Sequence, residues 1–327
     1  MNLVQVLSQA MNIAQKSIPV VLIGFAFGFI TTLLTLFFQT NMGEATHWGP
    51  AVGFLVYLIG IGLLGVFFQS GSLSFIRQVH AQGSAQLSDF VNGAKKNYVS
   101  LLILSILLIA IVFVAYILSL LLMETLPESA LGLAIMIMAF FALCLLSLGI
   151  LAMYAPYAIV ANGEKVFPAL RSSIDIVRAG QPVVYVFIYI LLLSISILFI
   201  TIILGSIYQA IGLDDAIAFP LTMICSLGLI LLATVSWPQF RNSRIAQSPY
   251  FLTFITVAVV VMSNQLIIFG LDIFSSMLGA REATALSPIT LATLFISTLI
   301  NSFFGIWLMS SLMVLYHHFR NPSVQQA

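Results

Sequence analysis

The sequence predicts an all-α, polytopic membrane protein, and three observations support this fold class. Hydrophobic residues make up 61% of the 327 residues and charged residues only 6%, whereas a soluble globular domain carries about 25% charged residues. Uncharged stretches of roughly twenty apolar residues, the length that crosses about 30 Å of hydrocarbon as a helix, recur along the chain. These stretches also lack the alternation of polar and apolar residues that marks the strands of membrane β-barrels.

We expect about eight transmembrane helices in a single domain that covers residues 1–327. The predicted spans are Ile18–Gln39, Ala51–Ile76, Val99–Met123, Ala130–Ala161, Pro182–Tyr208, Ile217–Trp237, Tyr250–Leu271 and Ser287–Leu315. Prolines stand near the start of several spans, where the missing N–H would have no partner in the helix anyway. The small net charge of +1 gives no indication of a nucleic-acid partner.

Basic residues indicate the orientation of these spans. With the N-terminus inside, Arg281 is in an outer connection, and the other ten of the eleven Lys and Arg residues fall on the inner side. Short loops rich in Lys and Arg stay in the cytoplasm. We therefore expect a multi-pass protein of the bacterial inner (plasma) membrane with both termini in the cytoplasm.

Two inner connections have the spacing of short amphipathic helices that lie on a membrane surface. The first has apolar residues at Leu87, Phe90, Val91, Ala94 and Tyr98, and the second at Phe167, Leu170, Ile174 and Val177. In the second segment we expect an ion pair between Arg171 and Asp175, which are one helical turn apart. The N-terminal residues Met1–Gln15 are a further candidate.

These interfacial helices admit two interpretations. In the first, each helix is a solvated connector whose apolar face rests on the helix bundle. In the second, basic side chains attract anionic lipid headgroups, and the candidate contacts are Lys95, Lys96, Arg171 and Arg178. The connectors also recur at equivalent places, which indicates a weak parallel repeat of span, interfacial helix and span within about residues 60–208, followed by two further spans within residues 250–315.

The strongest local motif is Ala155-Pro156-x3-Val160-x6-Phe167-x3-Arg171-Ser172-Ser173. It resembles the YciC-like family of uncharacterised bacterial inner-membrane proteins and, more distantly, the membrane domain of some glycerophosphodiesterases. The resemblance implies a helical membrane protein of about six spans, from which this chain departs by having about eight. Because the chain lacks a soluble phosphodiesterase domain, no hydrolase activity is implied. Independently of the family, Pro156 removes a backbone donor and predicts a bend in the fourth span.

Chemically reactive groups are missing from the predicted spans. Proton relays, ion-coupled pumps and intramembrane proteases need ionisable side chains inside the membrane, and the cores of these spans contain none. Sequence motifs for zinc proteases, serine hydrolases and P-loop nucleotide binding are also absent. His317 and His318 are adjacent and diverge on a helix, so they would not readily share one metal ion. We expect a non-enzymatic protein with no catalytic residues, cofactor or metal.

Four uncharged polar residues lie within spans: Gln69, Asn264, Gln265 and Asn301. Asn264 and Asn301 are each about 21 Å from the inner ends of neighbouring antiparallel spans. At matched depth their amides are able to bond to each other, which favours a structural role. The alternative is a polar lining for a substrate cavity.

Glycines in two spans predict close helix packing. They are the pair Gly24 and Gly28, and the cluster Gly60, Gly62 and Gly65. Neither group indicates a specific function.

We expect a membrane scaffold or assembly partner that interacts with membrane lipids and with another membrane protein. The alternative is an uncoupled transporter or facilitator of a small or lipid-like solute. A transporter needs a polar path that reaches the middle of the membrane, whereas a scaffold is able to pack solidly. A polar cavity would therefore favour the alternative.

The predicted orientation is testable by cysteine labelling in intact cells. Cysteines introduced at Ser84 and Ser243 should be shielded from an impermeant external thiol reagent, and a cysteine at Ser129 should react. Labelling of either inner position would overturn the orientation.

Overall fold

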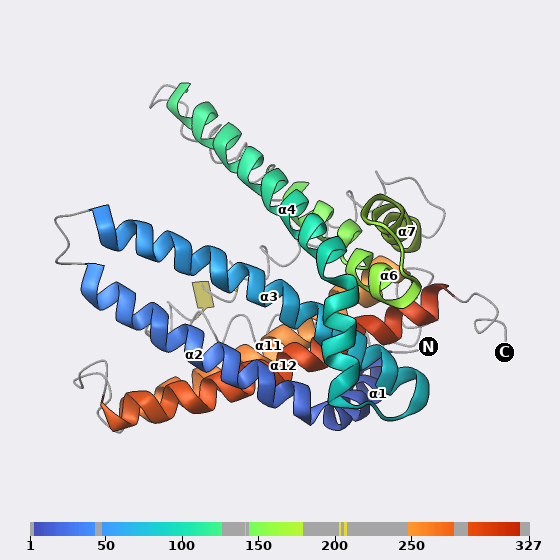
Figure 1. Cartoon of the computed structure of the whole chain (residues 1–327), viewed down its shortest axis with the longest axis horizontal. Helices are drawn as coiled ribbons and strands as arrows, with labels where there is room; N and C mark the ends of the chain where they lie inside the picture. The colour runs from blue at the N-terminus through green and yellow to red at the C-terminus, as the bar shows by residue number, and fades with distance from the viewer. Residues whose placement is uncertain are drawn as a thin grey trace. The chain divides into compact units, whose positions relative to one another are not determined.

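The computed structural model describes residues 3–42, 48–125, 144–178, 248–277 and 287–320, together with residues 141, 203, 206 and 207. All regular secondary structure in these ranges is α-helix (Figure 1). The helices are α1 (Leu3–Lys16), α2 (Ile18–Met42), α3 (Trp48–Gln82), α4 (Leu87–Thr125), α6 (Ala155–Asn162), α7 (Val166–Arg178), α11 (Pro249–Met277) and α12 (Pro288–Arg320). A further helical run, residues 144–152, precedes α6. The all-α fold class is confirmed for this part of the chain.

Six helical segments are long and apolar enough to cross a membrane. They are Ile18–Phe38, Val52–Gln82, Leu87–Leu121, Cys144–Asn162, Phe251–Leu271 and Pro288–Arg320. Each overlaps a predicted span, as expected for a multi-pass membrane protein. The other two predicted spans, Pro182–Tyr208 and Ile217–Trp237, lie outside the described residues except at positions 203, 206 and 207, so the number eight is not confirmed.

The chain divides into two compact units. The amino-terminal unit comprises Asn2–Tyr98 and Thr256–Val314, and the central unit comprises Val99–Ile255 and Leu315–Ala327 together with Met1. Helices α4, α11 and α12 contribute a segment to each unit. The single domain and the parallel repeat stay predictions, because part of the second copy of the repeat lies outside the described residues.

Helix α1 corresponds to the candidate segment Met1–Gln15 and buries its apolar face within the amino-terminal unit. The buried residues are Leu3, Val6, Ala10, Ile13 and Ala14. This face packs against α3. The indole Nε1 of Trp307 on α12 also donates a hydrogen bond of 3.3 Å to the carbonyl of Leu7. These contacts join α1 to two of the long helices.

The first predicted interfacial segment is not a separate helix. Residues 87–125 form one continuous helix, α4, about 58 Å long against a hydrocarbon thickness of about 30 Å. Within the amino-terminal unit, the start of α4 packs closely against the end of α3. A Cβ atom at Gly93 would lie 2.1 Å from the Cβ of Ser74, and the hydroxyl of Ser70 lies 3.2 Å from the carbonyls of Gly93 and Ala94.

Only part of the predicted apolar face of this segment is buried. Phe90 and Ala94 are buried, but Leu87 and Val91 are exposed. Asn97 is buried instead, and its amide donates to the hydroxyl of Ser74 at 3.3 Å. The contact with α3 combines Phe90, which lies against Gly71, with small and polar residues, so it includes only part of the predicted apolar face.

The second predicted interfacial segment does form a separate helix, α7. Gly163, at φ 67°, ends α6, and its N–H donates to the carbonyl of Ile159 at 2.9 Å. The buried residues of α7 are Val166, Ala169, Ser173 and Val177, whereas Phe167 of the predicted apolar face is 74% exposed. α7 packs against α6 through mainly small side chains, which explains why the predicted face differs from the buried one.

Asp175 pairs with Arg178 rather than with Arg171. The Nε atom of Arg178 lies 3.3 Å from Oδ1 of Asp175. Residues three and four positions apart are both neighbours on a helix, so the sequence alone did not distinguish the two arginines. The predicted pair between Arg171 and Asp175 is therefore wrong.

The fourth predicted span is interrupted at Met153 and Tyr154, shortly before Pro156. The hydroxyl of Ser173 in α7 bridges the interruption. It donates to the carbonyl of Leu151 at 2.6 Å and accepts a hydrogen bond of 3.0 Å from the backbone N–H of Tyr154. Ser173, the last residue of the motif that contains Pro156, thus supplies hydrogen bonds that the interrupted helix lacks.

Ser173→Ala should destabilise the protein by about 1–3 kcal/mol, because it leaves a buried carbonyl and a buried N–H without their partner. Thermal unfolding in detergent would measure the loss. Ser172→Ala is the matched control, since Ser172 lies beside Ser173 but is not part of the bridge. Equal effects of the two substitutions would contradict the role of Ser173.

Candidate functional site

Asn264 and Asn301 meet within the amino-terminal unit, as predicted. The Nδ2 atom of Asn264 on α11 donates to Oδ1 of Asn301 on α12 at 2.7 Å. Amides in hydrocarbon need partners inside the protein, and this bond supplies one, while Oδ1 of Asn264 is buried without a partner. The predicted contact between the two amides is confirmed.

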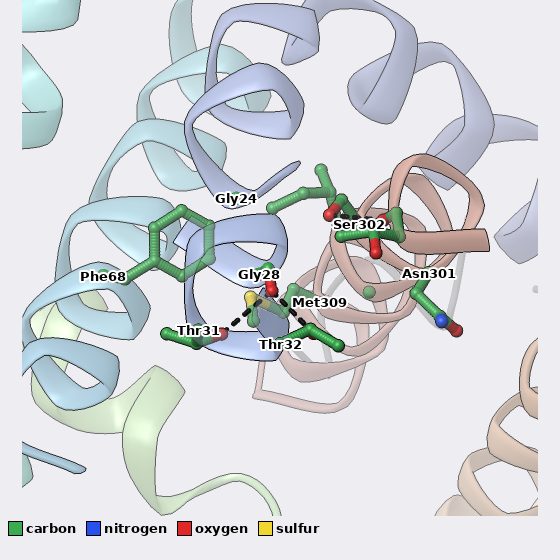
Figure 2. A pocket seen from close by; sticks show the side chains of 11 residues that line it. Gly24, Gly28, Thr31, Thr32, Phe68, Asn301, Ser302 and Met309 are labelled. Carbon is green, nitrogen blue, oxygen red and sulfur yellow. Dashed lines mark hydrogen bonds between the residues drawn. The ribbon is translucent and has the colours of Figure 1, made fainter. Parts of the chain in front are cut away.

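A cavity of about 320 Å³ lies next to this pair, between α2, α3 and α12 of the same unit. Figure 2 shows Thr31 and Thr32 of α2, Phe68 of α3, and Asn301 and Ser302 of α12 around it. The lining residues are Gly24, Gly28, Thr31, Thr32, Phe68, Thr298, Asn301, Ser302, Gly305, Ile306 and Met309. Asn301 therefore belongs both to the predicted pair with Asn264 and to the residues that line the cavity. The two interpretations of its role were the structural pair and the cavity lining. Neither Gln69 nor Gln265 belongs to the lining.

Two glycines of α2 shape the wall of this cavity. A Cβ atom at Gly24 would lie 2.7 Å from Cζ of Phe68, and one at Gly28 would lie 3.1 Å from Cγ2 of Thr298. The predicted close packing at these two positions is confirmed. Within the part of the chain that the structure describes, it is wrong for the cluster Gly60, Gly62 and Gly65, where an added Cβ would meet no atom within 4 Å.

The hydroxyl groups that line the cavity all donate to the backbone of their own helix. Thr31 and Thr32 donate to the carbonyl of Gly28 at 2.9 and 2.8 Å. Thr298 donates to the carbonyl of Leu294 at 2.7 Å, and Ser302 donates to that of Thr298 at 2.8 Å. A hydroxyl has one hydrogen and two lone pairs, so these groups present acceptors to the cavity.

The predicted spans assign the cavity a depth in the membrane. Counted at about 1.5 Å per residue from the predicted inner ends Ile18 and Leu315, Gly24 and Met309 would be about 9 Å deep and Thr298 about 25 Å deep. The middle of the hydrocarbon would be at about 15 Å. The described lining residues are polar or apolar but carry no charge.

A second polar cluster lies in the central unit, at the end of α12. The Nη1 atom of Arg320 lies 3.0 Å from Oε1 of Glu164, and Asn162 donates to the same oxygen at 3.1 Å. Arg320 and Asn162 both donate to the hydroxyl of Tyr316. No pattern in the sequence links Glu164 with Arg320, because the two residues are far apart in the chain.

The four candidate headgroup contacts differ in their surroundings. Lys95 and Lys96 are exposed on the part of α4 that belongs to the amino-terminal unit. In the central unit, Arg171 is exposed, whereas Arg178 is paired with Asp175. Among the described residues, no three His, Cys, Asp or Glu side chains form a group that would hold a metal ion.

The Asn264 and Asn301 pair predicts a measurable coupling. Asn264→Leu leaves Asn301 without its partner, whereas changing both residues to Leu removes the unpaired amide and should recover much of the loss. The expected coupling in thermal unfolding in detergent is about 0.6 kcal/mol. Gln265→Leu, at an exposed neighbouring position, should change stability little. Strictly additive losses would contradict the pair.

No protein-family model, no curated protein and no solved structure matches this chain. The resemblance of the motif around Pro156 to the YciC-like family therefore stays a prediction. The functional inference depends on two local features, the neutral polar cavity and the exposed side of α7.

Proposed function

We propose that the protein is a non-enzymatic, lipid-interacting scaffold of the bacterial inner membrane, with both termini in the cytoplasm. Its lipid contact is α7, and the observation that carries this proposal is the exposed Phe167 beside the exposed Arg171. The partners are anionic lipids and another membrane protein that the scaffold holds.

The faces of α7 support a position at a membrane surface. At about 100° per residue, Phe167, Leu170 and Ile174 form an apolar stripe roughly a quarter of a turn from the buried face. Leu170 and Ile174 are half-buried, so the stripe is only partly covered. A helix that dips an apolar stripe into the boundary between headgroups and acyl chains is the usual interfacial arrangement.

The basic residues of α7 stand at the outer edge of this stripe. Around the helix axis, Arg171 and Arg178 are roughly a sixth of a turn beyond the apolar stripe, on the side away from the buried face. From such a position, a long basic side chain reaches the headgroups while its stem covers apolar surface. Arg178 is paired with Asp175, which reduces its attraction for an anionic lipid. Arg171 is therefore the main contact of the two.

Arg171→Gln should reduce the anionic lipid that co-purifies with the protein by about fivefold, which corresponds to about 1 kcal/mol for one basic residue near a membrane surface. Mass spectrometry of extracted lipid would measure it. Arg178→Gln is the matched control and should have a smaller effect. Asp175→Asn releases Arg178 and should increase the bound lipid. Equal losses from the two arginine variants would contradict Arg171 as the main contact, and unchanged lipid in both variants would contradict the assignment to α7.

A second function, facilitation of an uncharged solute, is favoured by the cavity in the amino-terminal unit. A solid scaffold has no need of a neutral polar cavity of about 320 Å³ at mid-membrane depth. Its hydroxyl lining favours an uncharged solute, because no described lining residue carries a charge that would compensate the charge of an ion. No ionisable group in the lining would couple transport to an ion, so movement would follow the gradient of the solute.

A further inference from the structure

We propose that the cavity between α2, α3 and α12 binds the free alcohol group of an uncharged membrane amphiphile, of which a diacylglycerol is the simplest example. The proposal shares one premise with the facilitator function, namely that a solute enters the cavity. Binding and transport are separate properties, and they are measured separately.

The hydrogen-bonding groups of the cavity select a ligand that donates. Thr31, Thr32, Thr298 and Ser302 have each used their one hydrogen on a backbone carbonyl. What remains is a set of acceptor lone pairs, so an alcohol O–H of the ligand finds several partners. The amide of Asn301 points away from the other lining side chains (Figure 2), and its Oδ1 accepts from Asn264 on α11. A ligand with acceptors only would therefore find no donor among these four hydroxyls.

Electrostatics disfavour a charged headgroup. The lining residues that the structure describes include no Lys, Arg, His, Asp or Glu, and a charge at this depth costs several kcal/mol when it has no partner. Phospholipids, fatty-acid anions and amines would all bring such a charge. An uncharged amphiphile brings only its alcohol and ester groups to the site.

The size and the surroundings of the cavity indicate a lipid rather than a water-soluble polyol. At about 320 Å³ it is at the small end of the range for ligand sites, about 300–1,000 Å³. It holds a head and the start of a chain, with Phe68, Ile306 and Met309 as apolar contacts. Ile30, Leu34 and Leu299, which are close in sequence to lining residues, are exposed apolar side chains that acyl chains would contact outside the cavity.

Two glycines allow a matched test. Gly305 lines the cavity, and a Cβ atom there would meet no atom of the described residues within 4 Å, so Gly305→Leu adds a large side chain to the lining at an uncrowded position. Gly62 on α3 is equally uncrowded but does not line the cavity, so Gly62→Leu is the control. Thr298→Val with Ser302→Ala forms a second variant that removes two acceptors with little change in volume.

The experiment measures binding of tritiated dioleoylglycerol to the full-length protein in nanodiscs of uncharged phospholipid. Gly305→Leu should reduce the affinity at least tenfold, the double variant should reduce it about tenfold, and Gly62→Leu should leave it unchanged. Dioleoylglycerol with its alcohol acetylated should not compete. Thermal unfolding of each variant verifies that the fold is retained, and the double variant decides the question if Gly305→Leu does not fold.

Each result has a defined meaning. Equal competition by the acetylated lipid, or full binding to both cavity variants, would overturn the proposal. Displacement of the lipid by millimolar glycerol would overturn the assignment to a membrane amphiphile. Transfer of fluorescent diacylglycerol between the leaflets of proteoliposomes tests the facilitator function separately. Binding without transfer would support the alcohol site while contradicting facilitation, and absence of binding would overturn the site whatever the transfer rate.

Discussion

The need to satisfy every polar group inside the protein, where hydrocarbon offers no hydrogen bonds, is the constraint on which this structure depends. The amide of Asn264 meets it by bonding to Asn301, and the hydroxyls of Thr31 and Ser302 meet it by donating to their own helices. Both solutions leave acceptors unused. Oδ1 of Asn264 is buried without a hydrogen-bond partner, and a hydroxyl that donates to its own helix still has free lone pairs. Several such hydroxyls line the cavity.

The same constraint explains the contacts between neighbouring helices within each unit. In the central unit, the helix interruption before Pro156 creates backbone groups that the hydroxyl of Ser173 binds. In the amino-terminal unit, Ser70 bonds to carbonyls of α4, and Gly93 lets the two backbones approach. Small residues therefore determine which helix faces meet. Large apolar side chains that remain outside these contacts are exposed, as Phe167 is on α7.

The two proposed functions follow from different residues and different chemistry. The lipid contact of α7 depends on charge at a surface, so it weakens as salt screens Arg171. The alcohol site depends on uncharged acceptors at depth, where salt has little access. A protein with both features would hold anionic lipid at its edge and take up a neutral lipid within the membrane.

The sequence by itself determined the fold class, six of the long helices and the meeting of Asn264 with Asn301, because span length and depth follow from hydropathy and a fixed rise per residue. It did not determine which faces are buried. Hydropathy ranks Phe167 above Ser173, yet Ser173 is buried and Phe167 is exposed, because in a membrane small residues bring helices together while large apolar residues are equally stable in lipid. Only the tertiary structure, which brings Thr31 of α2 and Ser302 of α12 to one space, decided that a neutral cavity exists.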